Sequence, residues 1–175
     1  MGNTARHYAR AAFQSLGMDA VTLNPYMGYD AVEPFISDAS RGAFILCYTS
    51  NNSSQDFQQI PSKSGEPLYL RVAAKAREWN SGQNVGLVVG ATQAASVGEV
   101  RAIAPDLPIL APGVGAQGGD LETVLNAGRS ASGYGLIIPI SRAIIYAGTD
   151  QNYADRAGEQ AQLYKNTIQK AVAHE

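Results

Sequence analysis

The sequence contains few of the side chains that bind metals or form disulfides. Cys47 is the only cysteine among 175 residues, and His7 and His174 are the only histidines. One thiol excludes a disulfide within the chain, and no cluster of His, Cys, Asp and Glu has the spacing of a metal site. Cys47 lies in an apolar run, which predicts a buried core residue and suits a reducing, cytoplasmic setting.

The sequence also lacks a block of like charge and a long apolar run. Charged residues make up 16% of the chain and the formal net charge is −2, which disfavours a nucleic-acid-binding surface. No stretch reaches the roughly 20 apolar residues that a membrane span needs. Arg6, His7 and Arg10 are spaced as on a helix within residues 1–16, so we expect no signal peptide there. A phosphate ligand would therefore need a local site.

Five short apolar runs alternate with helical patterns. The runs are apolar at consecutive positions, which is typical of parallel strands buried on both faces. The predicted strands are Ala20–Leu23, Gly42–Tyr48, Asn84–Gly90, Leu107–Ala111 and Gly135–Ile140, and the predicted helices are Thr4–Leu16, Tyr29–Ser40, Pro67–Trp79, Ala94–Ala104, Asp120–Ala127 and Gln151–His174. In the first helix, Tyr8, Ala12 and Leu16 are expected to form the apolar stripe, with Ala11 and Phe13 adding to it. This rhythm predicts an α/β fold, as an open doubly wound sheet or as part of an eight-stranded barrel, which five units leave three short.

Polar residues follow each predicted strand. They are Asn24-Pro25-Tyr26, Thr49-Ser50-Asn51-Asn52, Ala91-Thr92-Gln93, the run from Pro112 to Gly119, and Ser141-Arg142. Both topologies bind ligands at the carboxyl ends of parallel strands, so a site is predicted at this edge. Ser50 and Asn51 can each donate to and accept from an amide edge, or they can cap the loop that follows.

A glycine-rich run, APGVGAQGGD at Ala111–Asp120, is the strongest local signal. Glycines allow close backbone approach, and free N–H groups before a helix N-terminus can bind an anion; the alternative is a tight turn without ligand. Gly113, Gly115 and Gly118 also match G-x-G-x-x-G, the pattern of an NAD-dependent oxidoreductase. The acidic residue expected about 20 positions later is missing, which disfavours that alternative.

Arginines differ in their expected roles. Arg142 directly follows the fifth predicted strand, where a guanidinium can bind a phosphate in bidentate fashion. Gln117, in the glycine-rich run, could close on the same phosphate. Arg101 and Arg129 fall in helix or loop positions and are expected to be surface charges.

Several segments together resemble one family. They are VTLNPYMGYDAVEPFI, GAFILCYTSNNSSQDFQ, NVGLVVGATQ, PDLPILAPGVGAQGGD and GLIIPISRAIIYA, and they resemble the longer bacterial subgroup of orotidine 5′-monophosphate decarboxylases. The resemblance implies a (β/α)₈ TIM barrel acting as a homodimer, without metal or organic cofactor. It implies conversion of orotidine monophosphate to uridine monophosphate and carbon dioxide in pyrimidine biosynthesis.

The resemblance also implies roles for individual residues. Gln117 and Arg142 would contact the substrate phosphate, with backbone support around Ser141. Ser50 would form a hydrogen bond with the pyrimidine, and Thr4 would reach the site of the partner subunit.

The catalytic motif of that family, Asp-x-Lys-x-x-Asp, does not occur in the chain. Its four lysines are Lys63, Lys75, Lys165 and Lys170, and none lies in an Asp-x-Lys pattern. We therefore expect residues 1–175 to be a single C-terminal part of a barrel domain, with about the last five βα units, no catalytic residue and no activity in isolation. The alternative is a non-catalytic phosphate- or nucleotide-binding module.

Overall fold

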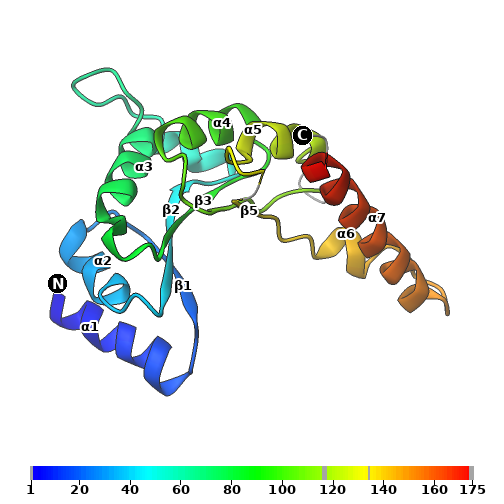
Figure 1. The fold of residues 1–175 in the computed structure, drawn as a ribbon, viewed down its shortest axis with the longest axis horizontal. Coiled ribbons are helices and arrows are strands. Elements are labelled where there is room, and N and C mark those ends of the chain that lie inside the picture. The colour runs from blue at the N-terminus through cyan, green and yellow to red at the C-terminus, as the bar shows by residue number, and fades with distance from the viewer. Residues whose placement is uncertain (1, 116–117, 134, 174–175) are drawn as a thin grey trace.

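The centre of the molecule is a five-stranded parallel sheet (Figure 1). The computed structural model describes residues 2–115, 118–133 and 135–173. The strands lie side by side in chain order and are β1 (Ala20–Leu23), β2 (Gly42–Tyr48), β3 (Val85–Val89), β4 (Ile109–Leu110) and β5 (Leu136–Ile137). The predicted bounds of β1 and β2 are confirmed.

The sequential strand order decides between the two predicted topologies. A doubly wound sheet reverses its strand order at a switch point, whereas here each new strand is added at the same edge. Right-handed crossovers in one direction place all the helices on one face, and Figure 1 shows them in an arc outside the sheet. This is the arrangement of consecutive βα units in a barrel, and it argues against the oxidoreductase alternative.

Helices occur at all the predicted places, with shifted ends. They are α1 (Gly2–Arg10), a π-helical turn η1 (Ala11–Ser15), α2 (Tyr29–Ile36), the 3₁₀ turns η2 (Asn52–Asp56) and η3 (Asn80–Gly82), α3 (Leu68–Trp79), α4 (Ala94–Ile103), α5 (Leu121–Gly128), α6 (Arg142–Ile145) and α7 (Tyr153–Ala173). Helix α2 stops short of the predicted Ser40, because the Asp38 carboxylate accepts a hydrogen bond from the Ser40 N–H at 2.9 Å and forms a turn.

The last two strands are shorter than predicted. Pro108 precedes β4 and Pro139 follows β5, and neither has an N–H to donate to a neighbouring strand. One backbone bond extends the pairing, from the Ala111 N–H to the Ile137 carbonyl at 2.8 Å. The chain is therefore free to turn into loops soon after these strands.

Helix α1 presents a different face from the predicted one. Ala5 and Ala9 are buried, whereas Tyr8 and Leu16 are 66% and 68% exposed. Two small side chains allow α1 to pack closely against α2, and the Phe13 ring meets the Phe35 ring edge-on at 6.1 Å. The predicted stripe is wrong at Tyr8 and Leu16, because close packing on α2 selects the face of Ala5 and Ala9, whereas Phe13 packs against the core as predicted.

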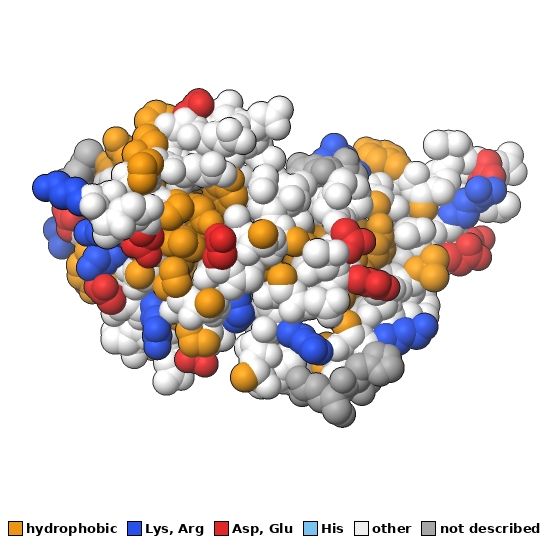
Figure 2. Space-filling view, turned by 90° about the horizontal axis from the view of Figure 1, so that it is seen from above, with side chains coloured by type: hydrophobic (Ala, Val, Ile, Leu, Met, Phe, Trp, Pro, Cys, Tyr) orange, Lys and Arg blue, Asp and Glu red, His pale blue; other side chains and the backbone are white. Residues whose placement is uncertain are grey.

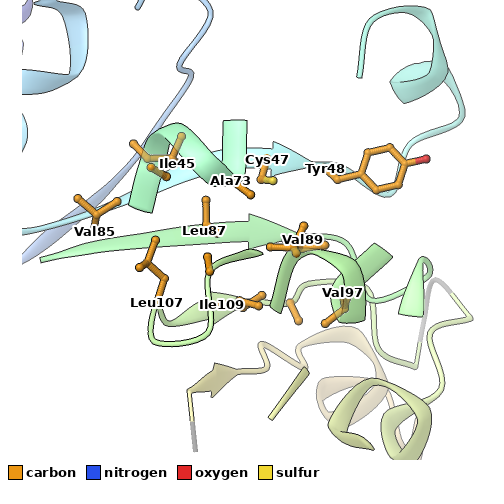
Figure 3. Packing of buried hydrophobic residues seen from close by; sticks show 14 of the residues in the cluster. Ile45, Cys47, Tyr48, Ala73, Val85, Leu87, Val89, Val97, Leu107 and Ile109 are labelled. Carbon is orange, nitrogen blue, oxygen red and sulfur yellow. The ribbon is translucent and has the colours of Figure 1, made fainter. Parts of the chain in front are cut away.

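The core lies between the sheet and the helices. One row of register partners crosses all five strands on this side, through Leu23, Ile45, Leu87, Ile109 and Leu136. Ile45, Leu87 and Ile109 are fully buried. Figure 3 shows this core, to which helices α3 and α4 contribute Ala73 and Val97. Cys47 is 4% exposed, which confirms the predicted buried cysteine.

The opposite face of the sheet has two rows of partners. Thr22, Phe44 and Gly86 form one, and Leu46, Val88, Leu110 and Ile137 form the other. In a closed barrel such residues fill the interior in layers. In this chain Ile137 is 47% exposed, so the second row is only partly covered.

Arg101 is not the predicted surface charge. It is 8% exposed, and its guanidinium donates hydrogen bonds to the backbone carbonyls of Gly128, Ala104, Pro105, Leu107 and Gly135. Burial lowers the pKa of Arg101, but a guanidinium stays charged in proteins. Arg101 thus ties the ends of α4 and α5 to the start of β5. Arg129 likewise donates to the Ala171 carbonyl and ties α5 to α7.

We expect Arg101→Met to lower the free energy of unfolding by about 3 kcal/mol or more, because the substitution leaves several buried carbonyls without donors. Urea unfolding followed by circular dichroism measures this change. Arg71→Met is the control, since Arg71 is exposed and should change stability by less than about 0.5 kcal/mol. Equal effects of the two substitutions would contradict the structural role.

A second prediction concerns the thiol of Cys47. Burial raises the pKa of Cys47 to about 12, so the reactive thiolate is absent at neutral pH. A disulfide reagent at pH 8 should leave the native protein unlabelled and label it fully in urea. Since the folded-state pKa is raised, the thiol's contribution to stability should be constant below pH 9 and decline as the pH rises toward 12. Rapid labelling of the native protein would contradict the buried environment.

Candidate functional site

The loops that follow the five strands lie at one edge of the sheet, because all the strands are parallel. Ser50 follows β2, Thr92 follows β3, the glycine-rich run follows β4, and Ser141 with Arg142 follows β5. This edge is therefore the candidate site.

Ser50 lies at a close approach between the loops after β2 and β3. A Cβ placed on Gly90 would lie 2.8 Å from the Ser50 nitrogen, and the Gly90 N–H donates to the Tyr48 carbonyl at 2.7 Å. Only glycine allows this contact, which fixes the half-buried Ser50 against the end of β3. Asn51 uses its side-chain oxygen within the loop, accepting from the Thr49 hydroxyl at 2.6 Å. Of the two roles predicted for Asn51, ligand contact and capping of the loop, the structure therefore favours capping of the loop.

The glycine-rich run bonds to itself. Gly113, Gly115 and Gly118 have φ of 112°, 77° and 85°, which glycine adopts readily. The Gly115 N–H donates to the Gly119 carbonyl at 3.2 Å, and the Gly119 N–H donates to the Gly113 carbonyl at 3.1 Å. These N–H groups therefore support the turn. Gln117, predicted to contact phosphate, lies outside the described residues.

The N-terminus of α5 is capped by a carboxylate of the chain itself. The Asp120 carboxylate accepts hydrogen bonds from the Thr123 N–H, at 2.8 Å, and from the Thr123 hydroxyl. These bonds lower the pKa of Asp120, so the group is ionised at neutral pH. A phosphate at this helix end would meet a like charge, so the predicted use of this terminus as an anion site is corrected.

The same loop packs against α6. A Cβ placed on Gly115 would lie 2.9 Å from the Ala143 Cβ and 3.0 Å from the Tyr164 hydroxyl. Ala143 directly follows Arg142, so the structure brings the glycine-rich loop and Arg142 together. Ser141 and Arg142 are exposed, and the Arg142 side chain has no hydrogen bond or ion pair among the residues that the structure describes. Its guanidinium is available to an anion.

Ser50 and Thr4 lie farther away. Three strand spacings separate β2 from β5, on the order of 14 Å along the sheet, which suits an elongated ligand better than one small anion. Thr4 is exposed on α1, whose first residue, Gly2, would place a Cβ 3.4 Å from the Asp30 carbonyl. This position is at the β1 edge of the sheet, and the structure does not bring Thr4 to Arg142.

Thr92 follows β3 at the same edge of the sheet, and the sequence predicts no role for it. Its hydroxyl is buried and has no hydrogen-bond partner within the described ranges. An unpaired buried hydroxyl is uncommon, and this one belongs to the candidate edge. The only signal in the sequence was its position directly after a strand.

Other kinds of site find no support in the parts of the chain that the structure describes. Residues 2–115, 118–133 and 135–173 contain no group of three His, Cys, Asp or Glu side chains that could hold a metal ion. No described helix is both long and apolar enough to cross a bilayer. Acidic and basic side chains are interspersed on the face shown in Figure 2, which has no patch of one sign.

A singly wound parallel sheet, with helices outside and a polar site at the strand ends, defines a protein of the (β/α)-barrel class. The sequence matches the orotidine 5′-phosphate decarboxylase / HUMPS family over residues 1–157, and the chain belongs to this family. The predicted resemblance and the predicted fold are confirmed.

Individual relatives agree with this assignment. The chain is 50% identical over 173 residues to an orotidine 5′-phosphate decarboxylase of Roseiflexus castenholzii, covering 98% of this chain and 64% of that protein. The enzyme of the same name from Ralstonia pickettii is 47% identical, with 96% and 62% covered. The chain thus spans less than two thirds of the length of these relatives.

Solved structures show the same fold. The structure of Leishmania donovani UMP synthase matches with a TM-score of 0.89 at 39% identity, covering all of this chain and 38% of that one. Leishmania donovani OMP decarboxylase matches with a TM-score of 0.82 at 37% identity, covering 95% and 63%.

The close approach at Gly90 gives a further prediction. Gly90→Ala should lower the free energy of unfolding by about 1–3 kcal/mol, because the new methyl meets the backbone of Ser50. In the control Gly158→Ala, the new methyl in α7 meets nothing within 4 Å, and it should raise stability by about 0.5–1 kcal/mol. Urea unfolding measures both. Unchanged stability of Gly90→Ala would show that the two loops are not held together as described.

Proposed function

We propose that residues 1–175 supply the phosphate- and pyrimidine-binding loops of an orotidine 5′-monophosphate decarboxylase, as a single C-terminal part of its barrel domain. The reaction is the conversion of orotidine monophosphate to uridine monophosphate and carbon dioxide. Family membership supports this, and one structural observation carries it. The glycine-rich loop packs on α6 at Gly115 and Ala143, which places the unpaired Arg142 beside it.

Each loop has one task in the proposed site. Arg142 binds the phosphate through its planar guanidinium, with Gln117 and the backbone around Ser141 as further contacts. Ser50, held against Gly90, forms a hydrogen bond with the amide edge of the pyrimidine. These contacts bind and orient the nucleotide without a metal or an organic cofactor.

Decarboxylation needs a group that these loops do not provide. Loss of carbon dioxide leaves a carbanion on the pyrimidine ring, which must be stabilised and then protonated. A lysine between carboxylates supplies the positive charge and the proton. Of the four lysines, Lys75 is paired with Glu78 at 2.6 Å on α3, and Lys165 and Lys170 lie on α7. Lys63 is exposed in the loop after β2 and does not lie in an Asp-x-Lys pattern. We therefore propose that the 175 residues alone bind nucleotide but do not turn it over.

We further propose that the protein works as a homodimer in the cytoplasm. Tyr26 and Phe57, near the ends of β1 and β2, are 81% and 63% exposed, and they line a cavity of about 590 Å³. Exposed aromatic side chains beside a cavity are common in protein interfaces. Thr4 would then reach the site of the partner subunit.

A second candidate is a non-catalytic nucleotide-binding module, favoured by the absence of Asp-x-Lys-x-x-Asp from the sequence. Both candidates predict binding of uridine monophosphate. They differ in whether a segment bearing the family's lysine motif, joined ahead of residue 1, creates turnover.

The first test mixes the purified chain with orotidine monophosphate and follows its absorbance, with uridine monophosphate binding measured by calorimetry. We expect binding without turnover. Arg142→Ala should weaken the binding of uridine monophosphate at least about tenfold, because a charge-assisted pair with the phosphate is lost. The binding of uridine, which has no phosphate, should be unchanged. Arg71→Ala is the matched control on an exposed arginine.

Two outcomes would overturn the proposal. Turnover by the 175 residues alone would show that another residue supplies the proton. Equal affinity of the Arg142→Ala variant and the unmodified chain for uridine monophosphate would remove Arg142 from the phosphate site.

A further inference from the structure

The loop after β2 closes on itself through one glutamine. Gln58 accepts a hydrogen bond from the Thr49 N–H at 2.8 Å through Oε1, and its Nε2 donates to the Thr49 hydroxyl at 2.9 Å. Thr49 and Gln58 are the two ends of the segment that contains Ser50, Asn51 and η2. Both ends are partly buried, so these bonds are shielded from water.

The bonds extend from Gln58 toward the ligand edge. The Thr49 hydroxyl also donates to the Asn51 side-chain oxygen at 2.6 Å. Ser50 therefore lies between two residues whose side chains are fixed relative to Gln58. On its other side, the backbone of Ser50 packs against Gly90.

The base of the loop is anchored in the core. Gln59 donates to the Tyr48 hydroxyl, and the Tyr48 ring stacks on Tyr69 with centroids 4.6 Å apart and planes at 19°. The Tyr69 hydroxyl in turn donates to Glu99 on α4. Tyr48 and Tyr69 are 1% and 5% exposed, so this end of β2 is rigidly held. Gln58 thus joins the far end of a surface loop to Thr49, which directly follows the rigid end of β2.

We propose that Gln58 is a positioning residue. By ordering the loop that carries Ser50, it strengthens the binding of the pyrimidine and has no effect on the binding of the phosphate. The assignment rests on the proposed function, because it concerns the ligand of Ser50. Both polar atoms of the Gln58 side chain are used on Thr49, so Gln58 acts through the loop. Arg142 belongs to a different strand end, and the phosphate contacts should not depend on Gln58.

The test compares two probes, uridine monophosphate and ribose 5-phosphate, by calorimetry on the full 175-residue chain. Gln58→Ala should weaken the binding of uridine monophosphate about tenfold, because the bonds that order the loop are lost, and should leave the binding of ribose 5-phosphate unchanged. Gln58→Glu keeps the acceptor for Thr49 and should restore most of the affinity. Gln55→Ala, at an exposed position of the same loop, is the matched control and should match the unmodified chain for both probes.

Hydrogen exchange of the ligand-free protein separates this inference from the proposed function. Gln58→Ala should speed exchange of the Thr49 amide about tenfold or more, since its acceptor is lost. Unchanged exchange, or equal weakening of both probes, would overturn the positioning role. If the unmodified chain showed no preference for uridine monophosphate over ribose 5-phosphate, the proposed function and the pyrimidine assignment would both fall, whatever the exchange result.

Discussion

The parallel register of the five strands is the constraint on which the rest of the structure depends. Register partners share a face, so one row from Leu23 to Leu136 packs against the helices and forms the core. The same register directs Phe44 and Leu46 to the opposite face, where a closed barrel has its interior. Parallel strands also end at one edge, and chain order without reversal brings their loops together there. Core, uncovered face and candidate site are thus three consequences of one arrangement of strands.

The two ends of the sheet have different tasks. At the amino ends, buried and half-buried polar side chains hold the connections in place. Arg101 donates to five carbonyls, and the Asn84 side-chain amide donates to the carbonyls of Ile36, Asp38 and Arg41. At the carboxyl ends, Gly90 and Gly115 allow close contacts between neighbouring segments, and Arg142 is exposed. This division matches the barrel rule that the amino end serves stability and the carboxyl end serves function.

In the proposed function, binding and chemistry are separated, because the binding loops of residues 1–175 do not carry the catalytic lysine. In that proposal, the loops after β2, β4 and β5 recognise a nucleotide through hydrogen bonds and one guanidinium. Such contacts hold substrate and transition state with similar strength, so they give affinity without a large acceleration. Acceleration needs a charge placed where the carbanion develops. Of the four lysines, Lys63 is exposed in the loop after β2 and the other three lie on helices, and none is in an Asp-x-Lys pattern.

The sequence by itself located the five strands, the longer helices and the residues at the strand ends, because these depend on short-range apolar patterns and on which residue follows which. It predicted the bounds of β1 and β2 but made β4 and β5 too long, and it did not predict α6. Ala20–Leu23, Gly42–Tyr48, Ser50 and Arg142 could all be placed in this way. The strand order, the alanine face of α1 and the burial of Arg101 were decided only by tertiary structure. Each depends on partners that a local pattern does not contain: Arg101 is buried because carbonyls from α5 and β5 surround it. A charged side chain looks like a surface residue until the fold supplies enough acceptors to hold it inside.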